Sequence, residues 1–181
     1  MNVKRILSWI YPILGIITFN NVLGKMDVYI TSVECINYLP DIIKNVSCTL
    51  DRTSLKTGSM DLEFALAQDV RDIQGIYILT LKKGSYLSNF TEIKVDLCQV
   101  LASVETYFLL KMVTNEVRRI GNLPMECPYK MNTRYTVNGF TINSNLIPSY
   151  MPVMNFISDL HTFFRSRKAG RVIVRGRFAR S

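Results

Sequence analysis

The stretch NFTEIKVDLCQVLASVETYFLLKMVTNEVRRIGNLPMECPY, residues 89–129, decides how this chain is expected to fold. From Asp96 onward, apolar side chains recur at spacings of three and four, which is the period of an amphipathic helix. The stripe comprises Leu97, Val100, Leu101, Val104, Phe108, Leu109 and Met112. Asp96 places a carboxylate where a helix N-terminus favours it, and Gly121 is a typical helix end. We therefore predict one helix over residues 96–119.

The four cysteines of the chain allow two disulfides and three pairings. Cys98 falls at the start of the predicted helix and Cys127 in the loop after it. Cys35 and Cys48 lie on two neighbouring predicted strands. We prefer Cys35–Cys48 and Cys98–Cys127, because each bond then joins segments that the fold already brings together, and the other pairings stay open.

Most of the remaining chain reads as β-strand, because β-branched and aromatic residues alternate with polar ones. The predicted strands are 27–36, 44–53, 59–66, 76–82, 134–142, 153–164 and 171–178. The strand 76–82 is apolar on both faces and should be central in its sheet, while Asn138-Gly139 should interrupt the strand 134–142 with a turn. We predict a mainly β protein: an antiparallel, immunoglobulin-like sandwich of about seven or eight strands with one packed amphipathic helix.

The N-terminus has the pattern of a secretory signal peptide. Lys4 and Arg5 precede an apolar run over residues 6–19, which is shorter than the roughly 20 residues of a spanning helix. We expect a signal peptide over 1–24, a secreted extracellular domain over 25–181, and no stable membrane span after cleavage. An uncleaved signal anchor is the alternative. Two sequons, at Asn45 and Asn89, fit the secretory route and predict glycosylation, with Asn89 in a predicted loop.

The charge of the chain is uneven. Its formal net charge is +8, and cations crowd the last seventeen residues without an acid among them: Arg165, Arg167, Lys168, Arg171, Arg175, Arg177 and Arg180. Such a patch suits an extracellular glycan, an anionic surface or a protein partner. The simpler interpretation is a solvated edge strand whose charges discourage pairing with other chains. Nucleic acid is not an expected partner of a secreted chain.

Residues for chemistry are few. His161 is the single histidine, so no multi-histidine metal site is expected. Asp159 would share a strand face with His161, but the chain has no Gly-x-Ser-x-Gly elbow to complete a triad. The glycines are scattered singly, so no glycine-rich phosphate loop is present. We predict no enzyme activity, no metal and no cofactor.

The residues that follow carry a resemblance to a known family. They are the strand that ends in Cys35, the segment Cys48-Thr49-Leu50-Asp51-Arg52, the apolar strand 76–82, the run from Asn89 to Leu101 and Cys127-Pro128-Tyr129. This order resembles a large secreted insect family, expanded in flies, that is known as a domain of unknown function. That family is related to the CheB chemosensory proteins and more distantly to ML-type lipid-recognition proteins. The resemblance implies an ML-like sandwich whose sheets can part around an apolar ligand.

Two interiors are compatible with this sequence. The inward faces should contain Met60, Phe64, Tyr77, Leu79, Phe156 and Phe163, which would line a ligand pocket or fill a solid core. A filled core is the simpler expectation. With a pocket, the chain would be a secreted binding protein for a lipid or a small hydrophobic chemosensory ligand. With a solid core, it would be an extracellular interaction or structural protein that binds a protein, a glycan or an anionic surface.

Overall fold

The computed structural model describes residues 25–52, 57–100 and 108–180, so the predicted signal peptide lies outside the described residues. Within the described part, the strands are β1 (Met26–Asn37), β2 (Ile43–Asp51), β3 (Ser59–Leu66), β4 (Ile73–Lys83), β5 (Tyr86–Asp96), β6 (Arg134–Phe140), β7 (Met154–Phe164) and β8 (Arg167–Arg180). The helical segments are α2 (Leu97–Val100), α3 (Phe108–Ile120) and the short 3-10 turn η2 (Ser144–Leu146).

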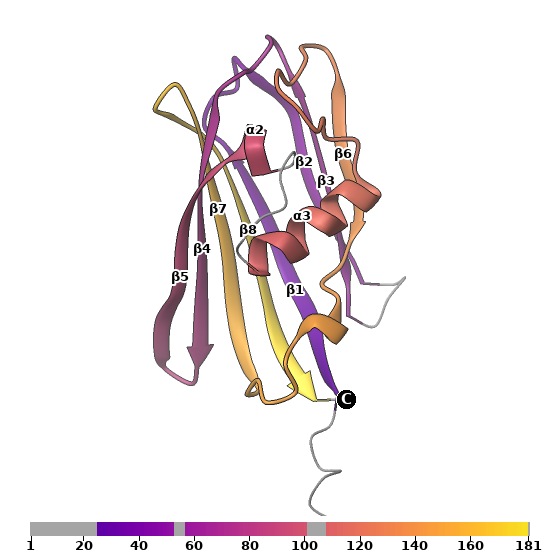
Figure 1. Ribbon diagram of the computed structural model, residues 1–181, viewed down its shortest axis with the longest axis vertical. Helices are drawn as coiled ribbons and strands as arrows, with labels where there is room; N and C mark the ends of the chain where they lie inside the picture. The colour runs from indigo at the N-terminus through magenta and orange to yellow at the C-terminus, as the bar shows by residue number, and fades with distance from the viewer. Residues whose placement is uncertain (1–24, 53–56, 101–107, 181) are drawn as a thin grey trace, which may run out of the picture.

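The eight strands form two antiparallel sheets. One has the order β1-β8-β7-β4-β5 and the other the order β2-β3-β6. Figure 1 shows the strands of the larger sheet side by side, with α3 crossing in front of them. The predicted mainly β, two-sheet architecture is confirmed, and β4 is internal to its sheet as its apolar sequence predicted.

The predicted helix corresponds to two helical segments, because α2 ends at Val100, α3 begins at Phe108, and residues 101–107 lie outside the described residues. The N-terminal role of Asp96 is confirmed: its carboxylate accepts hydrogen bonds from the backbone N–H groups of Cys98, at 2.9 Å, and Gln99, at 3.3 Å. Side-chain capping of this kind satisfies donors that have no partner inside the helix. Gly121 follows the end of α3, as predicted.

Two local predictions were wrong. The predicted loop around Asn89 is part of β5, which starts directly after a hairpin turn in which Gly84 has a positive φ of 61°. The pair Asn138-Gly139 does not break its strand either. Gly139 takes a φ of 74° within β6, opposite a register shift in β3, so the pair forms a bulge that bends the strand.

Disulfides lie at both places where the edges of the two sheets approach each other. Cys35 of β1 is bonded to Cys48 of β2, and these strands are edges of different sheets. Cys98 of α2 is bonded to Cys127, in the loop that leads to β6. The preferred pairing is therefore confirmed.

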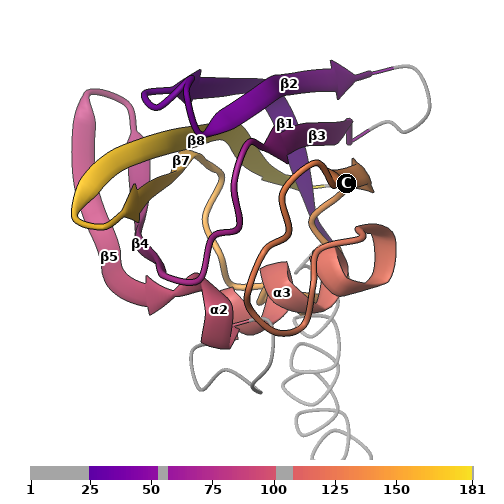
Figure 2. The same ribbon diagram turned by 90° about the horizontal axis from the view of Figure 1, so that it is seen from above.

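The helical segments occupy the second of these junctions. In Figure 2, α2 and α3 lie on the side of the molecule opposite β2. There α2 contacts β4 and β5 of the larger sheet, while α3 contacts β6 of the smaller sheet. The helices thus bridge the edges that no strand pairing closes.

Candidate ligand-binding cavity

A cavity of about 600 Å³ lies between the two sheets and α3. Its volume falls within the range of about 300–1,000 Å³ that is common for small-molecule sites. The lining is predominantly apolar and includes side chains from both sheets: Met60, Leu62, Phe64, Tyr77, Leu79, Val95, Val137, Phe140, Phe156, Leu160, Val172 and Phe178. The filled core that we expected from the sequence is therefore wrong.

Several side chains that face the interior remain partly exposed. Leu62, Phe64 and Leu160 are of intermediate exposure although they pack against the buried clusters of the two sheets. Because a close-packed interior would bury these side chains, their exposure is explained by the open space beside them.

Five of the six predicted pocket residues line the cavity, and Phe163 is not among the described lining residues. Successive side chains of a strand point to opposite faces. On β7 the lining residues are Phe156, Ser158, Leu160 and Thr162, all at even positions. Phe156 and Phe163 are seven residues apart, so the alternation of β7 cannot turn both toward the interior.

The helical segments form the third wall of the cavity, and none of their residues was among the predicted pocket residues. Leu110, Val113 and Val117 of α3 line the space, and Leu110 is 6% exposed. Met112 also lines the cavity and, like Leu97 and Val100, belongs to the predicted helical stripe. None of these residues was predicted as part of a pocket. Thr114 is also buried against the cavity, and its hydroxyl donates to the Leu110 carbonyl oxygen at 2.9 Å.

A polar pair lies on the inward faces of two internal strands of the larger sheet. The Ser158 hydroxyl of β7 donates to the Tyr77 hydroxyl of β4 across 3.2 Å. Tyr77 is 9% exposed, and its burial raises the pKa of the phenol above its ordinary value. The phenol is therefore a neutral hydrogen-bonding group at physiological pH.

Charged groups that border the cavity are paired. Arg119 and Glu116 of α3 form an ion pair at 2.6 Å, and the Arg119 side chain is 66% exposed, which places the pair at the solvent edge of the cavity. Hydrogen bonding from Arg119 lowers the pKa of the Glu116 carboxyl. Arg171, which is also among the lining residues, binds Asp159 at 2.5 Å.

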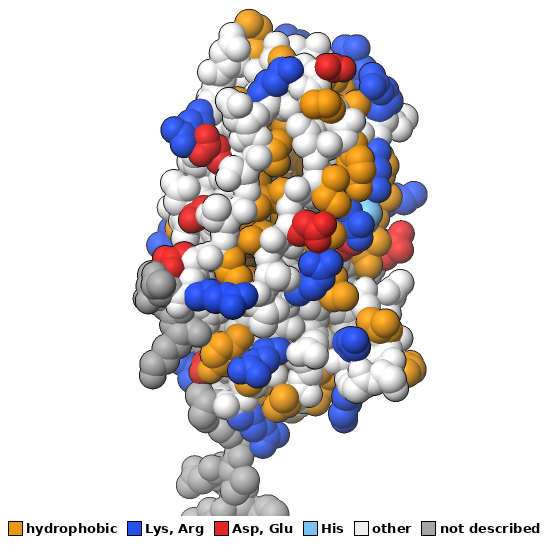
Figure 3. Space-filling view, turned by 180° about the vertical axis from the view of Figure 1, so that it is seen from behind, with side chains coloured by type: hydrophobic (Ala, Val, Ile, Leu, Met, Phe, Trp, Pro, Cys, Tyr) orange, Lys and Arg blue, Asp and Glu red, His pale blue; other side chains and the backbone are white. Residues whose placement is uncertain are grey.

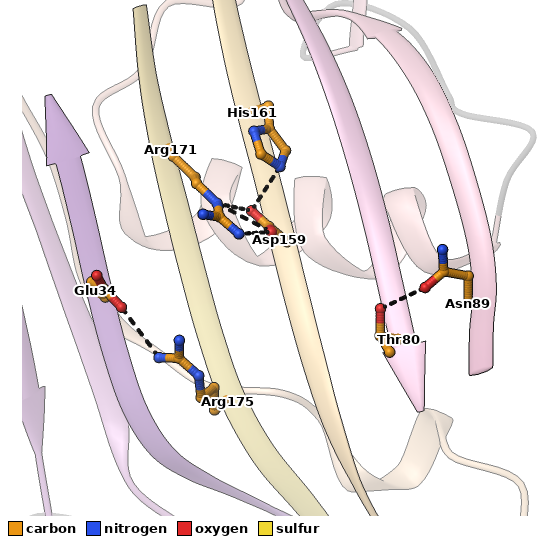
Figure 4. Close-up of polar contacts among 7 residues, drawn as sticks. All are labelled: Glu34, Thr80, Asn89, Asp159, His161, Arg171 and Arg175. Atoms are coloured by element: carbon orange, nitrogen blue, oxygen red, sulfur yellow. Dashed lines mark hydrogen bonds and ion pairs between the residues drawn. The ribbon is translucent and has the colours of Figure 1, made fainter. Parts of the chain in front are cut away.

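The outer face of the larger sheet holds the polar residues that we considered for catalysis. Figure 4 shows Asp159, His161 and Arg171 together on this face, with the helices behind the sheet. Arg171 donates to both carboxylate oxygens of Asp159, and the His161 Nε2 atom lies 3.3 Å from one of them. Ser158 faces the cavity, on the opposite side of β7. The cluster is therefore a bidentate ion pair with a neighbouring histidine.

The predicted basic patch is spread out. Arg165, Arg167 and Lys168 sit at the β7–β8 hairpin, while Arg171, Arg175 and Arg177 follow the outer face of β8 and Arg180 lies at its end. Figure 3 shows basic side chains scattered among acidic and apolar ones on this side of the molecule. β8 is also not an edge strand, because it pairs with β1 and β7. The edge-strand interpretation of its arginines was therefore wrong.

Most cations of this set have a partner. Arg171 binds Asp159, Arg175 lies 3.3 Å from Glu34, and Arg177 lies over the ring of Tyr29. At the hairpin, Arg165 stacks on Phe164 and Lys168 on Tyr38. These contacts weaken the case for one anion-binding surface.

The described residues contain neither a metal-binding cluster nor a helix that could span a membrane. The described histidine, cysteine, aspartate and glutamate side chains form no group of three that could hold a metal ion. No helix within the described ranges is long and apolar enough to cross a bilayer.

Comparison with known proteins gives one family. No curated protein matches the chain. Residues 76–158 match a family described as "Protein of unknown function (DUF1091)". The matched span runs from β4 into β7 and contains α2, α3 and the Cys98–Cys127 disulfide.

Proposed function

We propose that this protein is a secreted binding protein that carries a small hydrophobic ligand in the cavity between its two sheets. The observation that carries the proposal is the size and apolar lining of that cavity, about 600 Å³. Transfer of an apolar molecule from water into such a space is favourable, at roughly 25 cal/mol for each Å² of apolar surface removed from water.

The construction of the cavity supports this role. The two disulfides connect the sheets at both of their facing edges, and thus hold the walls together without filling the space between them. Disulfides persist in oxidising compartments, which fits a secreted protein. The insect family that the sequence resembles is related to the CheB chemosensory proteins and more distantly to ML-type lipid-recognition proteins, which supports the same class of ligand, a lipid or a small chemosensory molecule. The cavity favours this function over the alternative of an extracellular interaction module with a solid core.

A cavity-filling substitution tests the proposal. In the Leu160→Trp variant, the indole ring would extend into the cavity and occupy space that a ligand needs. Ile157 is the matched control, because it lies on the same strand but at an odd position that faces outward. We expect a fluorescent apolar dye such as phenylnaphthylamine to bind the wild type and Ile157→Trp similarly, and Leu160→Trp at least about tenfold more weakly.

Folding of both variants would be checked by urea unfolding. Native mass spectrometry of protein purified from its own secretory cells would then identify a retained ligand. If the wild-type protein binds no apolar dye, fatty acid or hydrocarbon, the carrier function is wrong.

A further inference from the structure

The cavity contains a built-in polar contact point that restricts which apolar ligand fits. Tyr77 and Ser158 place two hydroxyl groups on the inward faces of β4 and β7, and the register pairs these strands side by side through the middle of the larger sheet. The groups around them are mostly hydrocarbon, such as Leu79, Phe156 and Leu160. A hydrogen-bonding group in such surroundings has a strong preference for being paired.

Two hydroxyl groups cannot satisfy each other completely. Ser158 donates its proton to the Tyr77 oxygen, and this uses one of the two O–H donors of the pair. Within the described part of the chain, neither hydroxyl has another hydrogen-bond partner. The phenolic O–H of Tyr77 is thus available for an acceptor that enters the cavity. Some other polar groups of the lining have local partners: the Thr114 hydroxyl donates to the Leu110 carbonyl oxygen, and the Asn37 side chain donates to the Ile43 carbonyl oxygen.

The charge of the lining limits that acceptor to a neutral one. The charged residues among the described lining are Glu116, Arg119 and Arg171, and each is already engaged in an ion pair. An ionised carboxylate placed beside Tyr77 would lose its hydration without meeting an unpaired cation. Burial of a charge under these conditions is strongly unfavourable.

We infer that the ligand is a neutral aliphatic molecule with a carbonyl oxygen, such as an ester, a ketone or an aldehyde, and that this oxygen accepts a hydrogen bond from the Tyr77–Ser158 hydroxyl pair. The inference rests on the proposed function, since it concerns the same cavity. It separates this protein from a carrier of plain hydrocarbons, which would leave the Tyr77 donor unpaired, and from a carrier of ionised fatty acids.

Three ligands with the same number of carbons test the inference: decane, methyl octyl ketone and decanoate. The affinity of each ligand would be measured by displacement of phenylnaphthylamine from four proteins. These are the wild type, Tyr77→Phe, the double variant Tyr77→Phe/Ser158→Ala and the control Tyr29→Phe. Tyr29 lies on β1 outside the lining, so its variant loses a hydroxyl without altering the cavity. The double variant is needed because the Ser158 hydroxyl alone could still donate to the ligand.

We expect the wild type and Tyr29→Phe to bind the ketone about threefold to tenfold more tightly than decane, as one additional hydrogen bond would allow. This preference should shrink in Tyr77→Phe and vanish in the double variant, while decane affinity stays within about twofold. Decanoate should bind more weakly than the ketone at neutral pH.

Equal binding of ketone and decane by the wild type, or a preference that survives in the double variant, would overturn the polar contact point. Tighter binding of decanoate than of ketone would overturn the requirement for a neutral ligand. In either case dye binding remains, and so does the proposed carrier function. Failure of the wild type to bind the dye and all three ligands would overturn both. Should the double variant not fold, the Tyr77→Phe result decides.

Discussion

Cys98 and Cys127 are joined across the helical junction of the two sheets, with their Cα atoms 5.4 Å apart. The bond connects α2, which follows the edge strand β5, to the loop that leads to the edge strand β6. At the opposite junction, Cys35 and Cys48 bring the Cα atoms of β1 and β2 to 5.9 Å. The cavity is thus held from both sides by covalent links.

Removal of Cys98–Cys127 should destabilise the protein and prevent its export. The bond closes a segment of 29 residues, and restriction of the unfolded chain over such a length contributes about 3 to 4 kcal/mol. We expect the Cys98→Ala/Cys127→Ala variant to lose about this much free energy of unfolding in urea and to be retained by secretory cells. The control is Met125→Ala, an exposed side chain in the same loop. Normal export of the double variant would show that the bond is dispensable.

The ion pair of Arg171 with Asp159 should contribute more to the free energy of unfolding than the ion pair of Arg175 with Glu34. Asp159 is 8% exposed, so loss of Arg171 would leave a nearly buried carboxylate without its cation. We expect Arg171→Met, which keeps most of the aliphatic stem, to cost about 2 kcal/mol. Arg175→Met should cost less than about 1 kcal/mol, since the side chains of Arg175 and Glu34 are 44% and 48% exposed. Equal costs, measured by urea unfolding, would contradict this ranking.

The same carboxylate should make stability depend on acid pH. Burial raises the pKa of Asp159, but hydrogen bonds from Arg171 and the charges of His161 and Arg171 outweigh burial and leave that pKa below 3.8. A lowered pKa in the folded state stabilises the protein above the unfolded pKa, and this contribution is lost as the pH falls through the folded value. The difference in unfolding free energy between wild type and Asp159→Asn should have its maximum value at pH 7 and at pH 5, and should decrease below about pH 4. A difference that stays constant down to about pH 3 would exclude this linkage.

Gly176 should not tolerate a side chain. A Cβ atom at this position of β8 would overlap the ring of Phe156 and the carbonyl oxygen of Tyr29. Because the oxygen belongs to the backbone of β1, rotation of the Phe156 ring alone cannot relieve the overlap. We expect Gly176→Ala to cost about 1 to 3 kcal/mol in urea unfolding.

The control for that experiment is Gly84→Ala in the β4–β5 turn, where a Cβ atom would meet nothing within 4 Å and only the positive φ opposes the substitution. Its cost should be about 1 kcal/mol. A smaller loss for Gly176→Ala than for Gly84→Ala would mean that β1 and β8 can adjust.

Both sequons should accept a glycan when the protein is made in secretory cells. Asn89 is exposed on the edge strand β5, where its carbonyl oxygen accepts a hydrogen bond from the Thr80 hydroxyl at 3.1 Å (Figure 4). This bond uses the carbonyl oxygen of the side chain and not the amide nitrogen, to which a glycan attaches. Asn45 is exposed in β2 with a positive φ of 52°.

We expect the single variants Asn45→Gln and Asn89→Gln each to remove one glycan, seen as a step in electrophoretic mobility that glycosidase treatment abolishes. Unchanged mobility of one variant would show that its site is unused.

Local patterns in the sequence were sufficient for seven of the described strands and for the preferred disulfide pairing, but β5 was missed. The period of two over residues 59–66 predicted β3 with its correct bounds, because alternation of apolar and polar side chains is itself the geometry of a half-buried strand. The cysteines could be paired since each pair joins segments that are close in sequence or packed together. The helix start at Asp96 was also predictable, because capping involves only the neighbouring residues.

Local patterns failed where a side chain's face depends on long-range register. Phe163 was expected inside because it is large and apolar, but the alternation of β7 places it with the outward residues. The partners of the β8 arginines were equally hidden, since Glu34 lies 141 residues from Arg175 in the chain.

The sequence by itself predicted the antiparallel sheets, the helical region within residues 96–119 and the preferred pairing of the four cysteines, since these follow from periodicity and spacing along the chain. Only the tertiary structure decided that the interior is open and that the Tyr77 and Ser158 hydroxyl groups meet within it. The same apolar side chains would fill a core if the sheets lay closer. The helices and disulfides at the two junctions hold the sheets at their observed separation. That separation depends on contacts between segments far apart in the chain, so local sequence patterns do not reveal it.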